Sequence, residues 1–431
     1  MRTGKGTVNM QMPRQLSQVA PAKIASTVTE ARVTWIKVFA GSLLAAYLLR
    51  ITIPAVWLKS ISPYAVNFGG YFVLAAALIY FLTRSLNVDG PSMFLLGSVI
   101  ATIFFSKDLG VAVSKGLLWV LLFVVVGPLL GGPKARAFRD LLWRWHKEAI
   151  LIVTVVSFFW YIARLPQYGK GVSGITLHCM LLGPFAALAA IYATVKTIET
   201  RSYKYGFMAV VSFLTCLVSG SRSAALGAVA AVAMIPILRI KSRALRWICV
   251  ILLLGTAFLV RSAFHLDSLD GSPVFKSGSP FEQYVAELQR KGMSNTRERL
   301  WEARWSEFDS SPIVGIGIGV EEGGGLRTEY GTIVVEPGSS YLAALSMTGI
   351  IGALGLGILL VSLVMKFQQK WIFLNSTDRT EVVVVGMFWT VHAVAEGWIF
   401  AAGSILCLLF WVWVGRLSDL GSLPSKRSFA A

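Results

Sequence analysis

Charged residues are scarce in this chain of 431 residues: Asp, Glu, Lys and Arg make up 14% of it, whereas hydrophobic residues make up 55%. The mean hydropathy is +0.66, and a typical soluble domain, with about 25% charged residues, is far more polar. The apolar residues come in runs rather than in strict alternation, which excludes the pattern of barrel strands. We therefore expect an all-α integral membrane protein.

Side chains that bind metals are also few. The chain has four cysteines and four histidines, and no two cysteines have the spacing of a metal site. Cys179, Cys216, Cys249 and Cys407 all lie inside apolar segments. We interpret them as small core residues, and we expect no metal and no other cofactor.

A cleavable signal peptide is not visible either. Residues 1–33 are polar and basic and lack the short apolar core of such a peptide. They are too polar to form a core of their own, so we expect a disordered cytoplasmic tail. The first membrane span would then serve as the insertion signal.

About twelve apolar segments are candidate membrane spans. They are residues 35–57, 64–83, 92–106, 111–130, 149–165, 175–195, 206–219, 224–238, 247–260, 341–365, 382–396 and 399–414. Several are shorter than the roughly 20 residues that cross a core about 30 Å thick, so their limits are loose.

The orientation follows from the Lys and Arg residues, which give the chain a net charge of +18. They concentrate in alternate connections, and basic connections lie in the cytoplasm. This explains the charge without a nucleic-acid partner and predicts a bacterial inner-membrane protein with both termini cytoplasmic. The expected organisation is a tail (1–33), helices 1–9 (34–260), a periplasmic loop (261–340), helices 10–12 (341–415) and a cytoplasmic tail (416–431).

The large periplasmic loop, residues 261–338, is strongly acidic. It holds Asp267, Asp270, Glu282, Glu287, Glu298, Glu302, Glu307, Asp309, Glu321, Glu322, Glu329 and Glu336, out of 22 acidic residues in the whole chain. Connections this long are usually functional. Within it, Asn295-Thr296 can cap a helix of three- and four-residue apolar spacing that Pro312 would end, so we expect a partly helical loop.

Three clusters on this side could carry chemistry. The first is the turn Ser219-Gly220-Ser221-Arg222, whose Arg222 is either an anchor at the membrane interface or a clamp for an anion such as phosphate.

The second cluster is the loop helix, with Arg297, Arg299 and Arg304 beside Trp301 and Trp305. This helix could simply lie on the membrane surface with its Trp rings among the headgroups. The glycines that follow it do not form a nucleotide loop, because no strand-turn-helix unit surrounds them.

The third cluster is the start of the tenth span, where Glu336 precedes Ser339, Ser340 and Tyr341. Small polar residues at a helix start can be caps, but a carboxylate beside them could act as a general base. Further on, His392 and Glu396 stand four residues apart on an expected span, which would place them on one helical face. They would join helices or, at the outer end of the span, contact sugar.

The order of these motifs resembles the O-antigen ligase and polymerase superfamily over residues 169–352. The resemblance is carried by the Ser-Arg-Ser turn, by Arg297 four residues before Trp301, by the Pro-x-x-Gly-x-Gly segment after Ser311, and by the Tyr-Leu-x-x-Leu helix that starts at Tyr341. Upstream, the segment ending in His178 is similar to the approach of that family to a central span.

The resemblance implies an enzyme that transfers sugar from an undecaprenyl-diphosphate-linked oligosaccharide at the periplasmic face, without a metal and with inversion. Arg222 and Arg297 match the family's arginines and would neutralise the diphosphate. Membrane lipid is then a second partner, and a chain-length-regulating co-polymerase and export machinery are compatible protein partners. By position, the resemblance also implies substrate-binding roles for Arg299, Arg304, Ser339, Ser340, Tyr341 and His178.

One departure decides between the activities of the superfamily. Its ligases carry His-Asn at the start of the Tyr-Leu helix, and this chain has Gly338-Ser339. The resemblance is therefore closest to exopolysaccharide repeat-unit polymerases, with Glu336 as the nearest candidate base. The alternatives are a ligase that moves glycan to another acceptor and a transporter or flippase for a lipid-linked sugar.

Overall fold

The computed structural model describes residues 34–49, 63–82, 89–163, 174–176, 179–240, 242, 248–255, 296–320, 326–327, 333–334, 338–371, 374 and 376–421. These residues are almost entirely helical. The helices are α2 (Pro63–Leu82), α3 (Gly90–Phe104), α4 (Leu109–Val126), α5 (Gly132–Ala163), α6 (Cys179–Thr200), α7 (Tyr203–Val218), α8 (Arg222–Leu238), α11 (Thr296–Ser310), α12 (Ser340–Lys370), α13 (Ser376–His392) and α14 (Ile405–Gly421). A further helix spans Thr34–Leu49, and a helical stretch covers 248–255. The strands β1 (Leu326–Arg327) and β2 (Ile333–Val334) form one short antiparallel pair.

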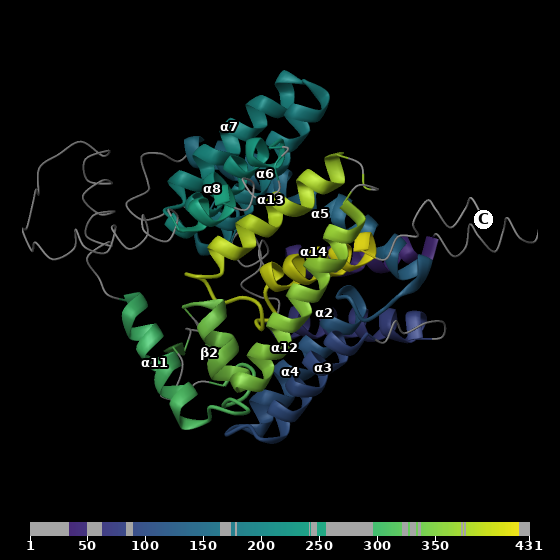
Figure 1. Cartoon of the computed structure of the whole chain (residues 1–431), viewed down its shortest axis with the longest axis vertical. Helices are drawn as coiled ribbons and strands as arrows, with labels where there is room; N and C mark the ends of the chain where they lie inside the picture. The colour runs from purple at the N-terminus through teal and green to yellow at the C-terminus, as the bar shows by residue number, and fades with distance from the viewer. Residues whose placement is uncertain are drawn as a thin grey trace, which may run out of the picture.

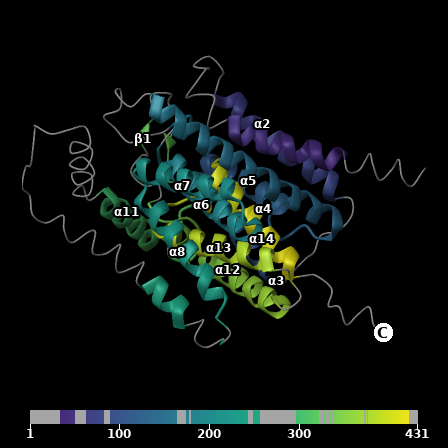
Figure 2. The same ribbon diagram turned by 90° about the horizontal axis from the view of Figure 1, so that it is seen from above.

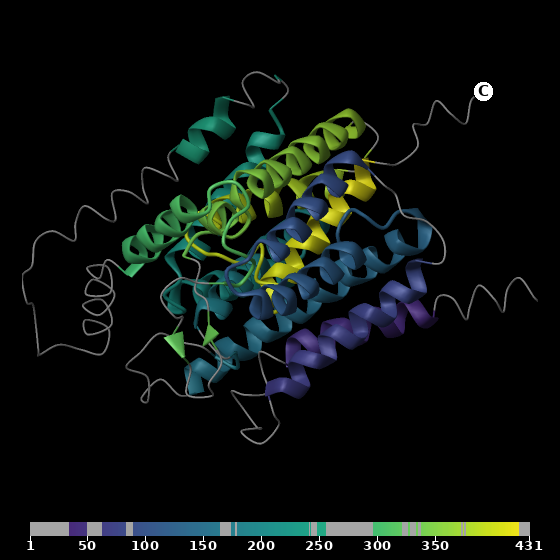
Figure 3. The same ribbon diagram turned by 90° about the horizontal axis from the view of Figure 1, so that it is seen from below.

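The long helices run side by side as a bundle, with α11 at one end of it (Figures 1, 2 and 3). Four described helices are long and apolar enough to cross a membrane: Leu109–Val126, Gly132–Ala163, Met180–Thr200 and Ser340–Lys370. Large apolar side chains also cover the outside of the bundle, including Phe72 and Phe104 at about three quarters exposed. Such a surface suits lipid rather than water, and the chain is a multi-pass membrane protein of helices.

Helix α5 differs from the expected span 149–165, because it begins at Gly132 and runs unbroken for 32 residues. At 1.5 Å per residue it is about 48 Å long, more than the roughly 30 Å of the hydrocarbon core. Its first half buries Ala135, Phe138, Leu142 and Trp143 at helical spacing against the rest of the bundle. The basic residues that suggested a connecting loop therefore belong to a helix that continues outside the core.

Helix α14 lies further along the chain than the expected span 399–414: it starts at Ile405, six residues later, and ends at Gly421, seven residues later. The reason lies at its far end, where Asp419 forms a two-point ion pair with the buried Arg139 of α5. Arg139 Nε lies 2.7 Å from Asp419 Oδ2, and Nη2 lies 2.6 Å from Oδ1. This pair keeps the last turn of α14 packed against α5.

Further ion pairs join three helices at the same end. Arg416 of α14 binds Asp140 of α5 and lies 2.7 Å from Asp378 of α13. Lys147 of α5 also pairs with Glu381 of α13. The end of the bundle that carries the basic residues is therefore tied together by charge, and the opposite end carries the candidate site.

Candidate functional site

The start of α12 is held tightly against α11. Gly338, with φ of 69°, lies so close to Leu300 that an added Cβ would be 2.9 Å from the Leu300 Cβ. The indole N–H of Trp301 donates to the Gly338 carbonyl at 3.3 Å. The start of α12 therefore packs against the loop helix, and Figure 1 shows α11 beside α12.

Ser340, the first residue of α12, connects this helix to the segment after α13. Its backbone N–H donates to the Ala393 carbonyl at 2.9 Å, and its hydroxyl donates to the Glu396 carbonyl at 2.7 Å. The same hydroxyl accepts the backbone N–H of Trp398 at 3.0 Å. Three hydrogen bonds from Ser340 thus hold residues 393–398. We call residues 393–404 the linker segment.

The linker segment corrects one expectation from the sequence. Helix α13 ends at His392, so His392 and Glu396 do not share a helical face. Both Ala395 and Glu396 direct their N–H groups to the His392 carbonyl at 3.2 Å, in a turn rather than a continuing helix. At this end, the Ala393 and Glu396 carbonyls accept the backbone N–H and the hydroxyl of Ser340 instead of helical N–H groups.

His392 is completely buried between two aromatic rings. Its imidazole stacks on Phe388, with ring centroids 5.1 Å apart, and on Trp398 at 6.0 Å. Its Nδ1 lies 2.8 Å from the indole nitrogen of Trp398. Because an indole N–H can only donate, Nδ1 is the acceptor, and a neutral His392 carries its proton on Nε2.

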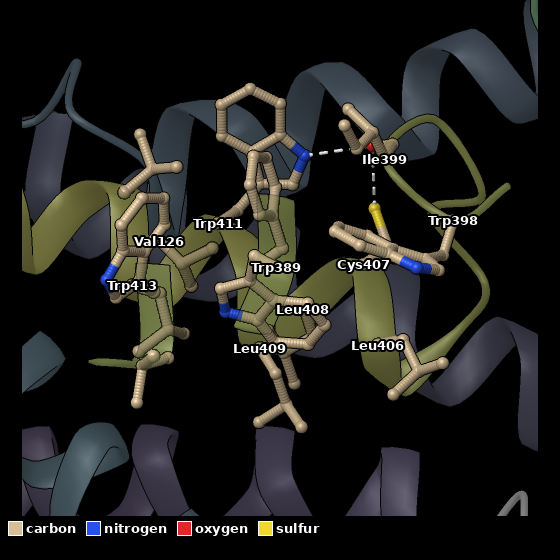
Figure 4. Packing of buried hydrophobic residues seen from close by; sticks show 14 of the residues in the cluster. Val126, Trp389, Trp398, Ile399, Leu406, Cys407, Leu408, Leu409, Trp411 and Trp413 are labelled. Carbon is tan, nitrogen blue, oxygen red and sulfur yellow. Dashed lines mark hydrogen bonds between the residues drawn. The ribbon is translucent and has the colours of Figure 1, made fainter. Parts of the chain in front are cut away.

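The other half of the linker segment is held through the Ile399 carbonyl. This one oxygen accepts from the indoles of Trp119 and Trp411, each at 3.1 Å, and from the Cys407 thiol at 3.2 Å. Figure 4 shows the bonds from Trp411 and Cys407. Tyr47 adds a bond to the Ala402 carbonyl at 2.7 Å. A buried non-helical backbone needs such donors, and here side chains from three helices supply them.

The loop after α11 is joined to α12 where that helix is broken. Gly349, with φ of 63°, interrupts the helix, and Ile316 and Gly317 donate to the Ser346 and Met347 carbonyls at 2.9 and 3.2 Å. In return, the N–H groups of Ile350 and Ile351 donate to the carbonyls of the loop. These partners are Pro312 at 2.8 Å and Ile313 at 3.3 Å.

The connection between α3 and α4 closes over the same loop. The Ile316 carbonyl accepts from the Ser106 hydroxyl at 3.0 Å and from the Lys107 N–H at 3.2 Å. The Lys107 ammonium also lies 3.0 Å from the Ser310 hydroxyl at the end of α11. Connections that are distant in the sequence therefore meet at one end of the bundle.

Arg222 opens helix α8 at this end. The turn before it is fixed by Gly220, with φ of 74°, and by the Ser219 hydroxyl, which donates to the Cys216 carbonyl at 2.6 Å. Helix α8 packs along α13, with Gly227 in contact with Phe388. Since Arg222 begins α8 and His392 ends α13, both residues lie at the same end of that helix pair.

The Arg222 side chain is exposed, and the first turn of α8 adds the partial positive charge of a helix N-terminus. This combination favours an anion. Among the described residues, no group of three His, Cys, Asp or Glu side chains is placed to hold a metal ion.

The remaining predicted residues fall into two groups. Arg304 is fully buried on α11, and its Nη1 lies 2.8 Å from Glu307 Oε2. Ser339 is buried with its hydroxyl 3.4 Å from the Ala393 carbonyl, and Tyr341 donates to the Thr390 carbonyl at 3.0 Å. Their contacts are thus internal, and their substrate-binding roles stay predictions.

The second group lies outside the described residues. Arg297 and Arg299 belong to the first turn of α11, but their side chains are outside the description, as are His178 and Glu336. What sequence reasoning missed is the role of Ser340, whose partners stand more than fifty positions away.

Residues 207–357 match a family model described as O-antigen ligase. This segment, about a third of the chain, is similar to the O-antigen ligase/polymerase superfamily. The match runs from α7, through Arg222 and the loop after α11, to a point beyond the break at Gly349. It confirms the resemblance inferred from the motif order and supports an enzyme in general. No curated protein matches the chain.

Proposed function

We propose that this chain is a polymerase that joins undecaprenyl-diphosphate-linked oligosaccharide repeat units into an exopolysaccharide, capsule or O-antigen. The reaction takes place at the periplasmic face of the inner membrane. The observation that carries the proposal is the position of Arg222, within the family match, at the N-terminus of α8 and at the same end as the start of α12.

In the reaction, the acceptor hydroxyl oxygen forms a bond to the anomeric carbon of the donor sugar. The bond from that carbon to the diphosphate oxygen breaks, and the diphosphate leaves with the electron pair. Arg222 and Arg297 would stabilise the charge that develops on the leaving group, because a guanidinium makes two parallel bonds to phosphate oxygens. Attack from the face opposite the diphosphate inverts the anomeric configuration, and neither a metal nor a nucleotide sugar takes part.

The proposal includes the twelve-span topology with both termini in the cytoplasm. This topology is supported by two connections that it expects on the periplasmic side. The α3–α4 connection and the loop after α11 are hydrogen-bonded to each other at one end of the bundle. It is also supported by the basic residues at the other end, which pair with Asp419, Asp378 and Glu381.

A ligase is the second candidate, because the family model that matches is described as O-antigen ligase. Against it, Gly338-Ser339 stands where ligases of the superfamily carry His-Asn. Glycine has no side chain to act as a base, and the buried Ser339 hydroxyl, 3.4 Å from the Ala393 carbonyl, cannot replace an imidazole.

Deleting the gene and sizing the glycan on its lipid carrier tests the proposal. A missing polymerase leaves single repeat units on the carrier, whereas a missing ligase leaves full-length chains there. Repeat units that accumulate on the cytoplasmic side would instead indicate a flippase and would contradict both enzyme proposals.

A further inference from the structure

The linker segment brings the backbone of Glu396 to the start of α12. Glu396 is half-buried, and hydrogen bonds fix its backbone on both sides. Its N–H donates to the His392 carbonyl at 3.2 Å, and its carbonyl accepts the Ser340 hydroxyl at 2.7 Å.

Ser340 holds the backbone that follows Glu396. Its hydroxyl donates to the Glu396 carbonyl and accepts from the Trp398 N–H at 3.0 Å, so one side chain spans Gly397. Trp398 is itself fixed by its indole bond to His392 at 2.8 Å. The backbone of Glu396 is therefore positioned by residues of α12 and α13 together. A fixed backbone limits where the carboxylate can lie, as a reacting group requires.

The other acidic residues described at this end have different roles. Asp108 caps α4 by accepting the Val111 N–H at 3.0 Å. Glu307 is buried against Arg304, and Glu302 and Asp309 lie exposed on α11. Of these carboxylates, Glu396 alone lies in direct backbone contact with the first residue of α12.

We infer that Glu396 is the general base of the glycosyl transfer and that Ser340 is its positioning residue; this inference rests on the proposed polymerase function. The Glu396 carboxylate takes the proton of the acceptor hydroxyl while that oxygen attacks the anomeric carbon. The bond to the diphosphate breaks, and the diphosphate carries away the electron pair. Glu396 thus takes the role that the sequence suggested for Glu336.

The test uses the purified full chain with a lipid-linked repeat unit as substrate and measures kcat and KM as functions of pH. Glu396→Gln keeps the size of the side chain but removes the base. General-base catalysis contributes about 10²- to 10⁴-fold, so kcat should fall by that factor with KM little changed, and the acidic limb of the pH profile should disappear. Glu302→Gln, on the exposed face of α11, is the matched control and should behave as the wild type.

Two further variants separate catalysis from folding. Glu396→Asp keeps a carboxylate and should retain part of the activity with a displaced acidic limb. If Glu396→Gln does not fold, this displacement decides, because a profile that superimposes on the wild type would overturn the inference. Ser340→Ala should lower kcat while the acidic limb persists.

The outcomes also distinguish this inference from the proposed function. If Glu396→Gln polymerises normally while Arg222→Ala does not, the polymerase stands and the base assignment is wrong. Loss of the acidic limb in Glu336→Gln instead would assign the base to Glu336. If the wild-type protein forms no polymer from lipid-linked repeat units, the proposed function fails before the base is in question.

Discussion

Ile316 donates its backbone N–H to the carbonyl of Ser346 at 2.9 Å and so replaces a hydrogen bond that α12 lacks. In an unbroken helix that carbonyl would accept the N–H of Ile350, which here donates to Pro312 at 2.8 Å. The loop after α11 is therefore inserted into the break of α12, and the loop and the helix satisfy each other's backbone groups. This arrangement connects the loop helix rigidly to a membrane-spanning helix.

The insertion predicts a large effect of Gly349→Ala. Gly349 has φ of 63°, and an added Cβ would lie 2.2 Å from the Ile313 carbonyl oxygen. Strain of this kind costs about 1–3 kcal/mol before the overlap is relieved. We expect a clearly lower melting temperature of the full chain in detergent, and loss of transfer activity.

The matched control is Gly357→Ala in the same helix, where an added Cβ meets nothing within 4 Å. Alanine favours helix over glycine by about 1 kcal/mol, so this variant should melt at or above the wild-type temperature. Equal melting temperatures for the two variants would show that the loop is not needed for the break in α12.

The sequence predicts part of this arrangement and misses the rest for physical reasons. The helix after Asn295 and its end before Pro312 follow from local capping and spacing, and α11 at Thr296–Ser310 confirms them. The break at Gly349 depends on hydrogen bonds to a distant loop, and a glycine inside an apolar run gives no local sign of such a partner.

The limits of α5 and α14 are a different case, because the sequence itself contains a pattern that marks a longer helix. Phe138, Arg139, Leu142 and Trp143 follow the three- and four-residue spacing of a buried helical face, but span limits drawn at charged residues hide it. Charge marks the end of the hydrocarbon core and not the end of a helix. The end of α13 could not be predicted, since Ser340 lies more than fifty positions upstream.

A second prediction concerns the ion pair between Arg139 and Asp419, whose side chains are 1% and 10% exposed. Asp419→Asn or Arg139→Ala leaves a buried charge without its partner, which costs about 3–5 kcal/mol. We expect a strong drop in the melting temperature of either variant. Lys196→Gln breaks an exposed pair with Glu199 and should cost at most about 1 kcal/mol.

Comparing the melting temperatures of the two kinds of variant can contradict this prediction. If Asp419→Asn melts no lower than Lys196→Gln, the pair does not hold α14 to α5. Replacing both Arg139 and Asp419 by apolar residues of similar volume should restore part of the lost stability, because the desolvation of the two charges is removed together.

The twelve-span topology makes a third prediction about which side of the membrane each end faces. Glu302, exposed on α11, belongs to the expected periplasmic loop, and Ser242, exposed after α8, belongs to an expected cytoplasmic connection. In intact cells with a permeable outer membrane, a membrane-impermeant thiol reagent should label Glu302→Cys and not Ser242→Cys.

Of the native cysteines, Cys216 and Cys407 are buried and Cys249 is partly buried, so the chain without an engineered cysteine is labelled in parallel as the background. After the inner membrane is opened, both engineered cysteines should react. Labelling of Ser242→Cys in closed cells would reverse the orientation and would place the candidate site in the cytoplasm, against the proposed function.

The last prediction is that Arg222 acts through the shape of its guanidinium as well as its charge. Arg222→Ala should abolish polymer formation while the protein still inserts and melts normally, because the side chain is exposed at the start of α8. Arg222→Lys keeps the charge but cannot make two parallel bonds to a phosphate oxygen pair. We expect it to lose most of the activity, by at least about tenfold, since each good charged hydrogen bond contributes about 1.5–3 kcal/mol.

Arg239→Ala, at the opposite end of the same helix and also exposed, removes the same charge from the chain and should leave the length of the polymer unchanged. If Arg222→Lys and wild type give the same turnover, the residue supplies only a diffuse positive charge, and the diphosphate is held elsewhere.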